Sequence, residues 1–246
     1  MVTAELERHR ARLICVTPAH QFPSGSVLTL ERRLELLRIA SKQRTFVLED
    51  DYDSEFHYEG RPPAALRSLD VAGRVIYVGS FSKTLFPSLR LGYIVCPVAL
   101  RADLFRAKRL DDLGSPVTEQ AALAAFIRSR QFDKHVRRCV LQLARRREVL
   151  LAGLKRHAGD RIEVHGSHGG VHVVVWFRQL TYPQLERLIR RASDRGLGLY
   201  PIHTSYRTRP ARPGLLLGYA GLSAASIESA TRLFGQCLDE ELGRTG

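Results

Sequence analysis

The sequence predicts an α/β protein in two parts, a mainly parallel sheet followed by a smaller α+β part. Short apolar runs rich in β-branched residues alternate with an amphipathic helical pattern between residues 13 and 96. Polar and charged side chains come directly after two of these runs, as is typical of ligand sites at the carboxyl ends of parallel strands. We expect a large domain at residues 1–113 and a small domain at residues 114–246.

The first part contains a strand-helix-strand unit and then two further strands. Leucines and Ile39 recur at helical spacing among charged residues from residue 30 to 43, which predicts an amphipathic helix. Residues 56–73 show little periodicity and predict a loop with one helical turn near residues 64–69. The expected strands are at residues 13–16, 46–48, 75–79 and 91–96.

The second part mixes long helices with short strands. The Gly-Ser-Pro sequence at residues 114–116 is the expected hinge, and Ser223 is the expected N-cap of the last helix. His172 lies inside an apolar strand, as a core histidine or as a residue facing a cleft. The expected helices are at residues 97–112, 117–128, 131–157, 182–195 and 223–242. The expected strands are at residues 161–164, 170–177, 197–200 and 215–219.

Composition sets the class of protein. A chain of 246 residues with 44% apolar content is large enough for a packed core, and it has no apolar run near the ~20 residues that span a bilayer. The formal charge of +13 has three explanations: solvated arginine-rich helix faces, attraction of anionic ligands, or contact with nucleic acid. We rank them in that order because no nucleic-acid-binding module is readable.

The cysteines indicate a reducing compartment. They are far apart in the sequence and form no Cys-x-x-Cys pair, so we expect free thiols, mostly buried, and a cytoplasmic protein. The four residues are Cys15, Cys96, Cys139 and Cys237.

A loop with a single lysine follows the apolar run at residues 75–79. Lys83 stands near the end of a buried strand, where desolvation would favour its neutral, nucleophilic amine. Ser80, Ser82 and Arg90 supply hydroxyl donors and a permanently charged guanidinium, which suit a phosphate. The alternative for Lys83 taken alone is an ordinary solvated loop lysine.

Acids follow the preceding strand. Residues 46–48 lead into Glu49, Asp50, Asp51, Tyr52 and Asp53. A lysine at one strand end and an acid at the next are what pyridoxal 5'-phosphate requires, because the lysine forms a Schiff base and the acid keeps the pyridine nitrogen protonated.

Three stretches carry a resemblance to a known family. They are Thr-Pro-Ala-His-Gln-Phe-Pro-Ser-Gly at residues 17–25, Glu-Asp-Asp-Tyr-Asp-Ser-Glu-Phe at 49–56 and Ser-Phe-Ser-Lys-Thr-Leu-Phe-Pro at 80–87. The sequence resembles the aminotransferase-like domain of GabR/MocR-type transcription regulators, which belong to the fold-type I (class I/II) aminotransferase superfamily. The resemblance covers essentially the whole chain, and the second motif favours the regulator branch.

The resemblance assigns a role to individual residues. Lys83 matches the Schiff-base lysine, Asp50 the partner of the pyridine nitrogen, and Tyr52 the donor to the phenolic oxygen of the ring. Ser80, Ser82 and Arg90 match phosphate ligands. Asp51 and Asp53 have a plainer interpretation as exposed loop acids, and only the family pattern favours Asp50 over Asp51.

The resemblance also implies partners and a partial domain. Leucine stands where many aminotransferases carry a carboxylate-binding arginine late in the small domain, so Arg207 and Arg209 in the preceding loop are the candidate ligands of a substrate carboxylate. Family members are homodimers, and DNA binding would need a domain outside these residues. Elements of the family's large domain that precede residue 13 are not readable, so we expect the C-terminal portion of a longer protein.

Three functions follow as hypotheses. The first is a sensor domain in which an amino acid or amine displaces Lys83 from the cofactor. The second is a catalytic aminotransferase in which the released Lys83 moves a proton. The third is a truncated remnant without cofactor.

Overall fold

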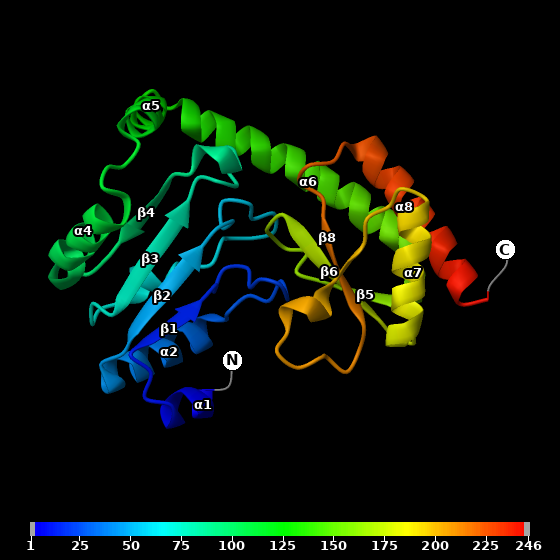
Figure 1. Cartoon of the computed structure of the whole chain (residues 1–246), viewed down its shortest axis with the longest axis horizontal. Helices are drawn as coiled ribbons and strands as arrows, with labels where there is room; N and C mark the ends of the chain where they lie inside the picture. The colour runs from blue at the N-terminus through cyan, green and yellow to red at the C-terminus, as the bar shows by residue number, and fades with distance from the viewer. Residues whose placement is uncertain (1–2, 244–246) are drawn as a thin grey trace. The chain divides into compact units, whose positions relative to one another are not determined.

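The computed structural model describes residues 3–243 and divides the chain into two compact units (Figure 1). The division at Arg138 and Cys139 falls inside one long helix, α6 (Gln131–His157). The predicted domain boundary at residue 114 therefore lies within the first unit, as does the expected hinge. The first unit comprises residues up to Gln21, Val27–Glu55 and Gly60–Arg138, and the second comprises Phe22–Ser26, Phe56–Glu59 and the residues from Cys139 onward.

The first unit contains a four-stranded sheet in the order β1-β2-β3-β4. The first three strands pair in parallel and β4 pairs with β3 antiparallel, which confirms the predicted mainly parallel sheet. The strands are β1 (Leu13–Val16), β2 (Phe46–Asp51), β3 (Val75–Ser80) and β4 (Gly92–Val95).

Two helices cover one face of this sheet. The helix α2 (Leu30–Gln43) begins where the Thr29 side chain accepts a hydrogen bond from the amide of Arg32, and it packs with α3 (Leu66–Leu69) over the strands. Apolar residues at helical spacing on α2 meet alternate residues of the strands, because side chains alternate between the two faces of a sheet. The buried core residues are Ile14, Leu36, Ala40, Val47, Leu66 and Val75.

A buried arginine joins three segments of the first unit. The Arg33 side chain is 1% exposed and its three nitrogens donate to backbone carbonyls of Leu28, Ala64 and Pro18 at 2.8, 2.8 and 2.7 Å. A guanidinium has enough donors to satisfy several carbonyls at once, so one α2 residue holds the loop before the helix and the loop before α3.

Shorter elements complete the first unit. The helix α1 (Thr3–Arg8) precedes β1, and the short helix η1 (Pro87–Leu89) lies between β3 and β4. Two helices follow β4, namely α4 (Val98–Asp112) and α5 (Val117–Arg128), and neither contains a fully buried residue.

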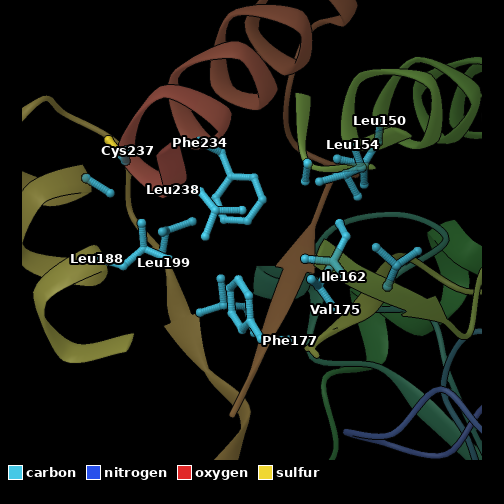
Figure 2. Packing of buried hydrophobic residues seen from close by; sticks show 14 of the residues in the cluster. Leu150, Leu154, Ile162, Val175, Phe177, Leu188, Leu199, Phe234, Cys237 and Leu238 are labelled. Carbon is cyan, nitrogen blue, oxygen red and sulfur yellow. The ribbon is translucent and has the colours of Figure 1, made fainter. Parts of the chain in front are cut away.

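The second unit is an antiparallel sheet with three helices. The strand order is β5-β6-β8-β7. Leucines of α6 and of the two later helices pack against Val173, Val175 and Phe177 of β6, as Figure 2 shows for the centre of this core. The further elements are β5 (Ile162–His165), β6 (His172–Phe177), α7 (Tyr182–Asp194), β7 (Tyr200–Pro201), η3 (Ile202–Ser205), β8 (Gly214–Gly218) and α8 (Ala224–Glu241).

The second unit matches most of the expected elements. Ser223 is the N-cap of α8, and its side chain accepts from the amide of Ser226. His172 is buried at 5% exposure, as a core histidine would be. The strand expected at residues 197–200 begins later than predicted, since β7 contains only Tyr200 and Pro201 and residues 197–199 lie outside the sheet.

Two further expectations concern the whole chain. All four cysteines are free, but only Cys237 is buried and Cys15 is exposed, so the expectation of mostly buried thiols is wrong. Cys15 lies on the sheet face that α2 does not cover. Among residues 3–243, no helix combines the length and the apolar character that a membrane span needs.

Replacement of Arg33 by methionine is expected to lower the free energy of unfolding by about 3 kcal/mol or more, because three buried carbonyls lose their donor. Urea denaturation followed by circular dichroism measures this loss.

The matched control is Arg32→Met, which removes an exposed side chain that pairs with Glu35 at 2.8 Å. We expect about 0.5 kcal/mol or less for this change. Equal losses in the two variants would contradict the proposed clamping role of Arg33.

Candidate functional site

Asp50 and Ser80 lie on the same face of the first sheet, near the carboxyl ends of two adjacent strands. Asp50 on β2 pairs with Val78 on β3, and Ser80 is two residues further along β3. Residues two apart in a strand share a face, so both side chains lie opposite the face that α2 covers. Leu48, Ile76 and Val78 on this open face are only partly buried.

The acids after β2 separate into distinct roles. Glu49 is 2% exposed and its carboxylate accepts from the amides of Leu66 and Arg67 at 2.7 and 2.8 Å, so it caps α3. Burial raises the pKa of Glu49, and the two amide hydrogen bonds oppose that shift. Glu49 is therefore a structural residue.

Asp51 is held by side chains on its own face. Its carboxylate accepts from the hydroxyls of Tyr77 at 2.7 Å and Ser54 at 2.6 Å. Asp51 is half-buried and already hydrogen-bonded, so it is less available to a ligand than its neighbour. The sequence could not distinguish Asp50 from Asp51, whereas strand alternation puts them on opposite faces.

Asp50 is exposed and lies on the open face. Neighbouring atoms bury part of its carboxylate, which raises the pKa of Asp50, and the charges of Asp51 and Asp53 raise it further. A cation next to Asp50 would reverse this shift, because an opposite charge favours the ionised carboxylate. The position thus suits a protonated ring nitrogen.

Lys83 lies in the turn that follows β3. Its side chain is exposed, because the turn extends beyond the strand end where solvent reaches it. The prediction that burial desolvates Lys83 is therefore wrong, since solvent reaches its side chain. Burial raises the pKa of Asp53, and the positive charge of Lys83 opposes part of that shift.

Several contacts fix the lysine turn from both sides. The amide of Phe81 donates to the carbonyl of Leu91 at 3.1 Å. Nε2 of His135 on α6 donates to the carbonyl of Thr84 at 2.7 Å. Phe132 of α6 contacts the Phe81 ring edge-on at a centroid distance of 5.8 Å. The first turns of α6 therefore hold the backbone on either side of Lys83, a role for His135 that no pattern in the sequence indicated.

The predicted phosphate ligands are close together in the sequence but differ in hydrogen bonding and in backbone conformation. The Ser80 hydroxyl oxygen accepts from the amide of Ser82 at 3.1 Å, which leaves its own proton available for donation. Arg90 is exposed and has φ of 52°, in the left-handed region that non-glycine residues rarely adopt. Such strain is concentrated at functional sites.

Tyr52 has a hydrogen-bond partner inside the protein. Its hydroxyl donates to the carbonyl of His20 at 2.8 Å. A phenol has one proton, so donation to a cofactor requires this proton to leave the His20 carbonyl. Burial and the charges of Asp53, Asp50 and Asp51 raise the pKa of Tyr52, which keeps the phenol protonated.

Asp53 is not the exposed loop acid of the plainer interpretation. It is 1% exposed, and its carboxylate lies 3.0 Å from Nδ1 of His20, which is 3% exposed. The segment of residues 17–25 and the acidic motif therefore meet in a buried pair. His20 and Asp53 belong to two separate sequence motifs, which was a signal that they could meet. Residue spacing alone could not predict this contact.

The two candidate carboxylate ligands lie in the second unit, on the loop after η3. Arg209 is stacked over the ring of Tyr182 with its Cζ atom 4.6 Å from the centroid. Arg207 is exposed, and none of the described residues forms a hydrogen bond or ion pair with it. Arg207 is therefore the more available of the two.

The arrangement in the first unit fits pyridoxal 5'-phosphate. An exposed carboxylate and a hydroxyl with a free proton share one open face, and an accessible amine follows the same strand. This donor set offers a negative charge for a ring nitrogen, hydrogen bonds for a phosphate and a nucleophile for an aldehyde.

Comparisons with known proteins agree with this chemistry. The sequence matches the family "Aminotransferase class I and II" over residues 2–225. It is 38% identical over 224 residues to the uncharacterized HTH-type transcriptional regulator YhdI of Bacillus subtilis, covering 91% of this chain and 47% of that protein. It is 39% identical over 220 residues to the probable rhizopine catabolism regulatory protein MocR of Rhizobium meliloti, covering 89% and 44%.

A solved structure has the same fold. The α-aminoadipate aminotransferase LysN of Thermus thermophilus, complexed with N-(5'-phosphopyridoxyl)-L-leucine, aligns with a TM-score of 0.86 at 27% identity, covering 98% of this chain and 62% of that one. The fold is therefore that of fold-type I pyridoxal-phosphate enzymes, as predicted. The chain spans about half the length of the curated relatives it matches.

The left-handed backbone of Arg90 gives a stability prediction. Arg90→Gly is expected to be more stable than Arg90→Ala by about 1 kcal/mol, because glycine adopts positive φ without steric cost. Urea denaturation of the two variants measures the difference. Equal stability would mean that the Arg90 backbone is not strained in solution.

Proposed function

The chain belongs to the aminotransferase class I and II family, and on that premise we propose that it is the ligand-sensing part of a GabR/MocR-type transcription regulator. Its cofactor is pyridoxal 5'-phosphate. The observation that carries the proposal is that Asp50 on β2 and Ser80 on β3 share the open face of the sheet, and that Lys83 lies in the turn after β3. The regulators YhdI and MocR, at 38% and 39% identity, support the sensor role.

Each residue of the first unit has a proposed task. Lys83 binds the cofactor aldehyde, and Asp50 keeps the proton on the ring nitrogen. Ser80 and Arg90 bind the phosphate, with Ser82 as a further donor, while Tyr52 orients the ring through its hydroxyl. When bound, the cofactor supplies an aldehyde that condenses with amines and a ring that withdraws electrons. Lys83 then accepts or returns a proton when an amino compound takes its place.

The ligand of the proposed sensor is an amino acid or amine. Arg207 is the preferred ligand of a carboxylate, because its guanidinium is free to form a bidentate pair whereas Arg209 is stacked on Tyr182. Binding would be reported to DNA by a helix-turn-helix domain outside these residues, as the names of the related regulators suggest. A cytoplasmic homodimer is part of the same proposal.

The second candidate function is catalytic transamination. The similarity to LysN at 27% identity supports it, since the residues proposed here would serve an enzyme equally well. Single-turnover reaction with a panel of amino acids separates the two. Full conversion of the cofactor to its amine form, followed by repeated turnover with a keto acid, would favour an enzyme over a sensor.

The first test concerns Lys83. Titration of the purified chain with pyridoxal 5'-phosphate is expected to give a visible absorbance band that Lys83→Ala abolishes, because no other amine occupies this position. Lys42→Ala, which changes an exposed lysine in the last turn of α2, is the matched control and should retain the band. A chain without lysine-dependent absorbance would support the cofactor-free remnant instead.

The second test separates two adjacent acids. Asp50→Asn is expected to weaken cofactor binding by roughly tenfold or more with little loss of stability, because an exposed charged hydrogen-bond partner is removed. Asp51→Asn is expected to lower stability, since Tyr77 and Ser54 lose a charged acceptor. Fluorescence titration and urea denaturation measure the two effects. The reverse pattern would move the ring-nitrogen role to Asp51.

A further inference from the structure

A buried histidine–carboxylate pair lies outside the proposed cofactor contacts. His20 and Asp53 are 3% and 1% exposed, and Nδ1 of His20 lies 3.0 Å from the Asp53 carboxylate. Burial of ionisable groups costs free energy unless they are paired, so such pairs often mark functional sites. No step of the proposed chemistry uses either side chain, although both belong to motifs that flank the site.

The pair joins the two segments that position Tyr52. His20 is linked to residues 52–53 twice, by its ring to Asp53 and by its carbonyl to the hydroxyl of Tyr52 at 2.8 Å. Adjacent residues of the acidic motif are thus tied to one residue of the preceding loop. The loop itself is held at Pro18 and Leu28 by Arg33, so His20 lies on a segment fixed on both sides.

The two links differ in what cofactor binding does to them. The Tyr52 proton cannot serve the His20 carbonyl and a cofactor oxygen at once. If the Tyr52 hydroxyl donated to a bound cofactor instead, the contact of His20 with Asp53 would still hold the Tyr52 backbone in place. A side chain that is already fixed loses less conformational entropy when it binds.

Asp53 also acts on the lysine. Burial raises the pKa of Asp53, whereas its hydrogen bond to His20 and the charge of Lys83 lower it. The attraction between Asp53 and Lys83 is mutual. The positive charge of Lys83 therefore favours the ionised form of the Asp53 carboxylate.

We propose that His20 and Asp53 are positioning residues for the cofactor, which fix Tyr52 where its hydroxyl can reach the ring. This inference rests on the proposed function of the same site. It assigns a role to His20 of the motif at residues 17–25 and to Asp53 of the motif at residues 49–56, neither of which has a proposed contact with the cofactor.

The test uses two substitutions of one histidine. His20→Asn places an amide nitrogen near the position of Nδ1 and can still donate to Asp53, whereas the longer His20→Gln places its amide nearer to Nε2. Asp53→Asn keeps an acceptor but removes the charge. Cofactor affinity is measured by fluorescence titration with pyridoxal 5'-phosphate, and ring orientation by the visible circular dichroism of the bound cofactor.

We expect His20→Asn to bind within about threefold of the unchanged chain and to keep its visible dichroism. His20→Gln and Asp53→Asn should each weaken binding by roughly tenfold, the effect of one charge-assisted hydrogen bond, and change the dichroism. In cofactor-free protein, hydrogen exchange of the amides at residues 17–28 should increase in His20→Gln but not in His20→Asn.

The outcomes that overturn the inference are distinct from failure of the proposed function. Affinity and dichroism unchanged in His20→Gln, or changed equally in both histidine variants, would overturn the positioning role. Faster exchange without a change in cofactor affinity would make the pair merely structural and would overturn it too. An unchanged chain without lysine-dependent binding would overturn the proposed function and this inference together.

Discussion

The parallel pairing of β2 with β3 is the constraint on which the site depends. Parallel strands end at the same edge of a sheet, and their paired residues share a face, so Asp50 and Ser80 lie together although thirty positions separate them in the sequence. The pairing also fixes what lies opposite. Glu49 and Asp51 fall on the other face, where one caps α3 and the other is bound by Tyr77 and Ser54.

The loops around this edge are held by contacts with distant elements. Arg33 binds the carbonyls of Pro18, Leu28 and Ala64, and His135 binds that of Thr84 beside the lysine. Backbone groups buried away from water need partners, and here side chains of helices supply them. The candidate site is therefore built on loops, and side chains of α2 and α6 fix these loops by binding their carbonyls.

The long helix α6 belongs to both units. Its first turns contact the lysine turn through Phe132 and His135, and its later turns contribute Leu150 and Leu154 to the core of the second unit (Figure 2). One helix therefore supplies contacts to the lysine turn of the first unit and to the core of the second.

Local patterns in the sequence determined the order of strands and helices, because a helix or strand that buries one face repeats apolar residues with its own period. They also predicted the chemistry of the candidate site, since few residue types can bind an aldehyde, a ring nitrogen and a phosphate. Tertiary structure decided the choice between Asp50 and Asp51, the burial of Asp53 with His20 and the exposure of Lys83. The physical reason is that strand register, and the packing of segments remote in sequence, decide which side chains meet and which remain in water.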